Sequence, residues 1–252
     1  MVIRSASFAL CATISVLAAQ GVPPSVPEGL LPTGAMVVET ADLRPATGKN
    51  RTLVLWMQNP TKEVRKPNDF YCGDEVYGDH WFGPTRLSLV DVTARKSVNT
   101  ISIESGYPAD SFQLPFRVHD AYYHVPLLDS DKEGKPRLLH LRDFTGDGVA
   151  AEFVLFGFAA CGIAETSVFG YQTISDQVVQ YPVEVTEGKG KPEVKFWIQQ
   201  IFRIEPPKPG HWNFSWNPGR GADFKFHERV YFDKVRQRFV QHRTMIPLKL
   251  KM

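Results

Sequence analysis

The sequence predicts an all-β protein whose strands form an antiparallel sandwich or a propeller-like stack of sheets, with little helix. About ten short runs are rich in β-branched and aromatic residues, which is the usual composition of strands. Gly, Pro, Asn and Asp separate these runs at intervals of roughly 8–15 residues, as in sandwiches and barrels. No long segment has the apolar spacing of an amphipathic helix.

The N-terminal residues are typical of a secretory signal. Arg4 precedes an apolar run at residues 8–19, which is shorter than the about 20 residues that cross a bilayer. We therefore expect residues 1–21 to be a signal peptide, 22–36 to be an extended leader, and 37–252 to form a single all-β domain. The alternative is an uncleaved anchor or an apolar first strand. The processed protein is expected to be exported, to the periplasm or outside the cell, and not to span a membrane.

In the N-terminal half, alternation and turn residues place the strands. Residues 37–40 and 52–58 fit strands, and the second run is β-branched and aromatic. Residues 86–92 and 97–103 alternate polar and apolar side chains on either side of a turn, which predicts a hairpin. Between residues 59 and 84 the chain is expected to form a long polar connection.

In the C-terminal half, further strands are expected at 167–173, 178–185, 224–232 and 238–243, the last two as a hairpin. Pro182 would confine its strand to a sheet edge, because proline donates no hydrogen bond to a neighbouring strand. Residues 193–204 fit a strand or a short helix, and their β-branched and aromatic content favours a strand.

Charge is distributed unevenly along the chain. Residues 189–252 carry 14 Lys and Arg against 5 Asp and Glu, whereas the preceding part of the mature chain is acidic. A basic region favours an anionic partner such as a cell-wall polymer, lipid headgroups or nucleic acid. We favour a simpler interpretation, in which the two regions offset each other within one fold, because the basic residues alternate with apolar ones and do not cluster. The partner is left open: a cell-envelope polymer or a protein fits, and nucleic acid is not expected.

Two cysteines follow the predicted signal peptide, Cys72 and Cys161. In an exported protein an even pair predicts a disulfide, and the alternative is two buried thiols. The bridge would close a loop of about 90 residues, which is worth roughly 4 kcal/mol if it acts on the entropy of the unfolded chain.

One acidic stretch, within residues 138–156, has residue types and spacing that indicate specific chemistry. Oxygen-bearing side chains occupy alternate positions from residue 143 to residue 147, and Gly148 follows. Calcium takes six to eight oxygen ligands, and alternating side chains converge on it where a glycine allows a sharp turn. The predicted ligands are Asp143, Thr145, Asp147, the carbonyl of Val149, and Glu152.

This stretch resembles the calcium loop of FG-GAP and VCBS repeat proteins, D-x-[DN]-x-D-G-x-x-[DE]. Asp143, Asp147 and Gly148 match, while Thr145 is a neutral ligand and the closing carboxylate falls one residue late, at Glu152. The resemblance covers about ten residues of the chain. It implies strands on both sides of the loop and a structural calcium ion, and it implies no activity. The alternative is a metal-free turn whose Asp and Thr side chains bond to backbone amides.

Aromatic residues suggest a second site. Trp212, Phe214 and Trp216 alternate along the chain, so on a strand they share one face. If exposed, they form a platform for a carbohydrate or a peptide; if buried, they belong to an ordinary core, which is the interpretation that we favour.

The sequence contains no catalytic motif that we can assign. The seven histidines lack metal-ligand spacing and are expected at the surface or in satisfied positions. We therefore expect a non-enzymatic binding or interaction module with a structural calcium turn. The alternatives are a secreted hydrolase whose site is built from loops, for example around Asp74 and His80, and a purely structural envelope protein. A hydrolase predicts a pocket that joins a histidine to carboxylates.

Overall fold

Fifteen strands and two short helical turns make up the regular structure of the residues that the computed structural model describes. These residues are 26–65, 78–103, 138–160, 163–199, 201–203, 206–219 and 221–248. The prediction of an all-β fold is confirmed. The predicted signal peptide, Cys72 and Cys161 lie outside the described residues, so the disulfide stays a prediction. In the part of the chain that is described, no helix combines the length and the apolar character needed to cross a membrane.

The first sheet has the order β1-β2-β5-β6. Its strands are β1 (Ala35–Asp42), β2 (Thr52–Gln58), β5 (Thr85–Asp91) and β6 (Lys96–Ser102), with the turn of helix α1 (Arg44–Thr47) before β2. The β5–β6 hairpin is the one that alternation predicted. The predicted polar connection at 59–84 contains a further antiparallel pair of strands, β3 (Thr61–Arg65) with β4 (Gly78–Phe82), which was not predicted from the sequence.

The middle sheet has the order β12-β8-β7, with β9 also paired to β8. Its strands are β7 (Glu152–Ala160), β8 (Ile163–Gln172), β9 (Gln177–Gln180) and β12 (Ile198–Gln199). The third sheet has the order β11-β10-β15-β14-β13. Its strands are β10 (Val183–Glu187), β11 (Glu193–Lys195), β13 (His211–Trp216), β14 (Phe224–Asp233) and β15 (Arg238–Pro247). Among these pairings β10 with β15 is parallel.

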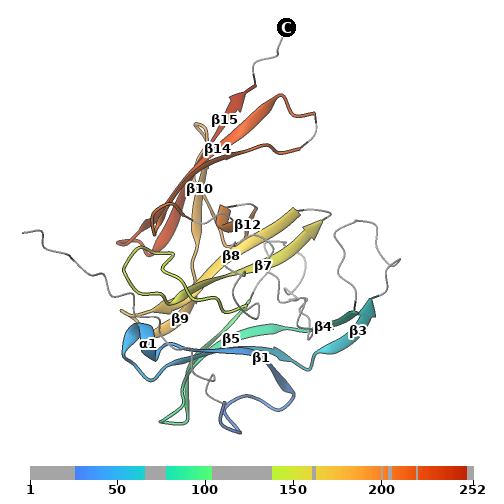
Figure 1. The fold of residues 1–252 in the computed structure, drawn as a ribbon, viewed down its shortest axis with the longest axis vertical. Coiled ribbons are helices and arrows are strands. Elements are labelled where there is room, and N and C mark those ends of the chain that lie inside the picture. Colours follow the sequence, from blue (N-terminus) through green and yellow to red (C-terminus); the bar gives the residue numbers. More distant parts are fainter. Residues whose placement is uncertain are drawn as a thin grey trace, which may run out of the picture.

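The middle sheet is buried on both faces, because alternate side chains of its strands enter two different cores. Phe153 and Phe169 pack with the first sheet, their rings 5.6 Å apart. Val154 and Val168, one position away, pack with the third sheet. Each such side chain contributes about 1.5–3 kcal/mol when it leaves water. Figure 1 shows the resulting layers, from the first sheet (blue to green) through the middle sheet (yellow) to the third sheet (orange to red).

An ionic network joins the first sheet to the middle sheet, at the start of β2, the end of β5 and the turn between β8 and β9. Arg51 donates to both carboxylate oxygens of Asp176, at 3.1 and 2.7 Å, and to Asp91 at 2.6 Å. The hydroxyl of Tyr171 donates to the same Asp176 at 2.7 Å. These donors, the guanidinium of Arg51 first, lower the pKa of Asp176 to about 2. The network fixes the turn after β8 against the first sheet.

Three local predictions differ from the structure. The run at 178–185 divides at Pro182 into β9 and β10, which belong to different sheets, and β10 lies between two strands and not at an edge. Residues 193–204 divide into β11, β12 and a 3-10 turn at Ile201–Arg203. Residues 138–142, just before the acidic turn, form no strand, because the amides of Leu138 and Leu139 donate to the carboxylate of Glu39, at 2.7 and 3.2 Å.

Candidate binding face

The acidic turn that the sequence singled out is held together by its own backbone amides. Asp143 accepts hydrogen bonds from the amides of Gly146, Asp147 and Gly148 at 2.6, 3.1 and 2.9 Å. The carboxylate of Asp147 accepts from the amide of Val149 at 2.8 Å. The carbonyl of Val149 accepts from the amide of Ala151 at 3.0 Å. Side chains that accept from nearby amides are the usual devices of an Asx turn.

Glu152 starts β7 and points into the core beneath this turn, where 1% of the residue is exposed. Its carboxylate accepts from the amides of Phe144 and Thr145 at 2.9 and 3.3 Å. Burial, followed by the charge of Asp147, raises the pKa of Glu152 to about 8 against the opposing effect of these amides. Within the described ranges, no three His, Cys, Asp or Glu side chains gather in a metal-binding group. Calcium binding at this turn therefore remains a prediction.

The acidic turn supports the third sheet. Gly146 and Gly210, both with positive φ, approach so closely that a Cβ on Gly146 would lie 2.8 Å from the carbonyl oxygen of Pro209. The ring of Phe144 stacks on Trp212 with 6.1 Å between centroids. Lys234, in the β14–β15 turn, donates to the carbonyl of Gly146 at 2.9 Å. The turn thus fixes where β13 begins.

We expect the free energy of unfolding to fall as the pH rises from about 4.5 to about 8, and this fall to be absent from Glu152→Gln. The folded protein holds a proton on Glu152 up to a pKa of about 8, whereas the carboxyl of the unfolded chain loses it near 4.5. Between these values the folded state binds one proton more, so a rising pH favours unfolding. Urea unfolding of both proteins across this interval, in chelator, measures the difference.

Repeating the measurement in excess calcium is the control for the pH dependence of stability. A bound cation stabilises the ionised carboxylate and lowers its pKa. If the turn binds calcium, an excess of the ion raises the melting temperature and removes the pH dependence, and Asp147→Ala abolishes both effects. Equal melting temperatures in calcium and chelator would contradict the calcium prediction. An equally steep pH dependence in Glu152→Gln would contradict the assignment to Glu152.

The three alternating aromatic residues share one face of β13, and this face is turned toward the core. Trp212 is 2% exposed and packs against Phe202 and Phe239. Phe214 and Trp216 are half-buried farther along the strand. The indole nitrogen of Trp216 donates to the buried Glu228 at 2.9 Å. Trp212 therefore lies in the core, whereas a ligand platform requires an exposed ring.

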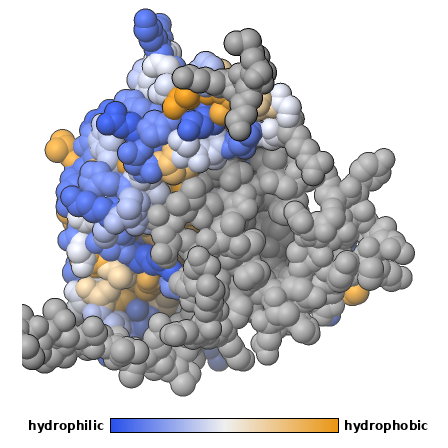
Figure 2. All heavy atoms as spheres, turned by 45° about the horizontal axis from the view of Figure 1, so that its top comes forward, coloured by the Kyte–Doolittle hydropathy of each residue, from blue (hydrophilic) through white to orange (hydrophobic). Residues whose placement is uncertain are grey.

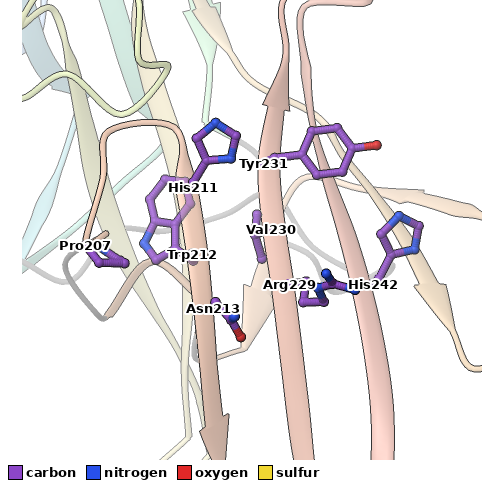
Figure 3. A pocket seen from close by; sticks show the side chains of 8 residues that line it. All are labelled: Pro207, His211, Trp212, Asn213, Arg229, Val230, Tyr231 and His242. Carbon is purple, nitrogen blue, oxygen red and sulfur yellow. The ribbon is translucent and has the colours of Figure 1, made fainter.

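The opposite side of this sheet, which we call the outer face, carries one arginine, two histidines and two other polar side chains close together. The pairing of neighbouring strands arranges these side chains in rows across the sheet, because residues directly opposite each other point to the same face. One row crosses His211 and Tyr231, and the next crosses Asn213, Arg229 and His242. All five residues are exposed. Figure 3 shows these side chains spread over the three adjacent strands β13, β14 and β15.

An open cavity of about 470 Å³ lies at this place. Its lining consists of Pro207, His211, Trp212, Asn213, Arg229, Val230, Tyr231 and His242. The rings of Tyr231 and His242 lie 6.3 Å apart and tilted by 30°. The lining therefore offers hydrogen-bond donors, one cation and an aromatic surface, and none of its residues is an Asp, a Glu, a Ser or a Cys.

Two carboxylates of the outer face lie together at one end of the sheet. Glu184 and Asp233 both accept from Arg236, each at 2.8 Å, next to the β14–β15 turn. Arg238 adds a second contact to Glu184 at 3.3 Å. The register neighbours of Arg229 are a neutral amide and an imidazole. In Figure 2, the coloured part of the surface is largely hydrophilic, with small apolar patches.

This face was not among the sites that the sequence predicted, although the information was present. Basic residues of the C-terminal region alternate with apolar ones, and the alternation was interpreted as evidence against a basic cluster. On a strand, however, alternation gathers like residues on one face. His211 and Asn213 on β13, with Arg229 and Tyr231 on β14, share one face for this reason.

Searches among protein-family models, curated proteins and solved structures gave no match for this chain, so its function is inferred from its own residues.

Proposed function

We propose that the protein is an exported, non-enzymatic binding module that holds an anionic polymer of the cell envelope against the outer face of its third sheet. The observation that carries the proposal is the exposed row around Arg229, where cationic and polar donors stand without a carboxylate beside them in register. A surface of one sign attracts partners of the other sign and raises the rate of encounter.

The chemistry of the cavity favours binding over hydrolysis. Its two histidines, His211 and His242, stand with Arg229, Tyr231 and Asn213. A triad-type hydrolase needs a nucleophile hydrogen-bonded to its base, and usually a carboxylate that orients the base. The lining provides no such carboxylate. The region around Asp74, on which the hydrolase alternative depended, lies outside the described residues.

Titration calorimetry with dextran sulfate and with polygalacturonate tests the proposal, with uncharged dextran as the reference. We expect binding to at least one polyanion, and binding that weakens steeply between roughly 50 and 300 mM salt because exposed charges are screened. Arg229→Glu should weaken binding at least tenfold. The matched control is Lys96→Glu, which makes the same change of charge at an exposed site on the first sheet. Binding to neither polyanion, or equal weakening by both variants, would overturn the proposal.

A further inference from the structure

The row of Asn213, Arg229 and His242 continues across the sheet to Thr186 on β10, which is paired with His242 in the parallel register. Four neighbouring strands thus place an amide, a guanidinium, an imidazole and a hydroxyl in one line. Strands lie about 4.8 Å apart, so the three residues centred on Arg229 stand within about 10 Å of one another. Every member of the row is able to donate a hydrogen bond.

The rows on either side differ from this one. The row of His211 and Tyr231 continues through Val240 to Glu184, whose carboxylate is already bound by Arg236 and Arg238. In the row below, the hydroxyl of Ser215 lies 3.1 Å from Nδ1 of His227, so these two groups bond to each other. The central row therefore differs from both flanking rows: it contains neither an ion-paired carboxylate nor a pair of side chains bonded to each other.

From this arrangement we infer that the central row binds the tetrahedral oxyanion of a phosphate or sulfate monoester, and that Tyr231 packs against the sugar or polyol that carries it. This rests on the proposed function and specifies the group that the polymer presents. The planar fork of Arg229 suits two oxygens of such a group, and its neighbours supply donors to a third. A carboxylate has two oxygens in one plane and leaves the flanking donors unused.

The size of the cavity agrees with a ligand of this class. A volume of about 470 Å³ falls in the range of about 300–1,000 Å³ that is usual for small-molecule sites. Tyr231 is 37% exposed, so part of its ring is available to an apolar surface of the ligand. Aromatic rings pack well against the apolar faces of such groups while their polar ends stay in water.

Glucose 6-phosphate, glucose 6-sulfate and glucuronate, titrated separately into the full chain, test the inference. We expect at least one monoester to bind at least tenfold more tightly than glucuronate. Tighter binding of glucose 6-phosphate than of glucose 6-sulfate would identify a phosphate as the oxyanion, and the reverse order would identify a sulfate. Arg229→Lys keeps the charge and loses the fork, so it should weaken monoester binding at least tenfold. His227→Gln, one row away, should leave it unchanged.

The outcomes separate this inference from the proposed function. If dextran sulfate or polygalacturonate binds but neither monoester does, or if glucuronate binds as well as the monoesters, the inference fails and the binding module stands. Equal binding by wild type and Arg229→Lys would also overturn it. If neither polyanion binds, the proposed function itself fails. Circular dichroism melting of each variant checks folding, and substitutions at exposed sites such as Arg229 normally change stability by no more than about 0.5 kcal/mol.

Discussion

Glu228→Ala is expected to lower the free energy of unfolding by about 3–5 kcal/mol, because it removes the buried carboxylate that pairs with a largely buried cation and leaves that cation only the exposed Glu187 as a partner. Glu228 is fully buried in the third sheet, where its carboxylate accepts from Arg243 at 2.7 Å. It also accepts from Gln241 at 2.7 Å and from Trp216 at 2.9 Å. All three donors lose their acceptor at once. Urea unfolding followed by tryptophan fluorescence measures the loss.

The matched control is the same substitution in an Arg243→Met background. The guanidinium carbon of Arg243 lies 4.9 Å from the centre of the Phe226 ring. Methionine fills much of the same space beside this ring, and it carries no charge that needs a partner. In this background, Glu228→Ala should therefore lower the free energy of unfolding by at least about 1 kcal/mol less than it does in wild type. This difference is the coupling energy of Glu228 and Arg243. Equal losses in the two backgrounds would show that Glu228 acts through its volume and not through its charge.

Local pattern was sufficient to predict the class of fold and several of its strands. The alternation at 224–232 and 238–243 matches the β14–β15 hairpin, and period-two spacing correctly placed Trp212, Phe214 and Trp216 on one face. The apolar run that begins at Phe153 has the composition of a strand buried on both sides. The sequence alone could not show that this strand belongs to a middle layer, since that depends on contacts between distant segments.

At two of the failed predictions, a side chain or a single proline replaced an ordinary strand pairing. The carboxylate of Glu39, 99 residues before Leu138, binds the amides that a neighbouring strand would have bound. Pro182 does not merely restrict a strand; it marks the point where the chain leaves the middle sheet for the third. Local composition shows the proline but not the change of sheet, and it gives no sign of the contact between Glu39 and residues 138–139. The candidate site was missed for a related reason, because the register of three strands brings Asn213, Arg229 and His242 together.

Trp212→Ala is expected to lower the free energy of unfolding by about 3–5 kcal/mol, the usual cost of removing a large buried aromatic side chain. The indole fills the junction between the third sheet and the acidic turn, where it contacts Phe202 and Phe239 with ring centroids 5.4 and 5.8 Å away. It also stacks on Phe144, so its loss removes one of the contacts that hold β13 on the turn. Thermal and urea unfolding of wild type and variant measure the cost.

The same variant separates a core role from a ligand platform. Trp212→Phe keeps an aromatic ring in the core and should cost less than half as much as alanine, since less volume is removed. If Trp212 acts as a core residue, both variants keep polyanion binding at a temperature where they are folded, because the donors of the rows around Arg229 lie on the opposite face of β13. Trp212 borders the cavity but belongs to neither of these rows. If it is a platform residue, binding falls while stability is preserved. With 2% of Trp212 exposed, the first outcome is expected, since this ring packs in the core and stacks on Phe144 of the acidic turn.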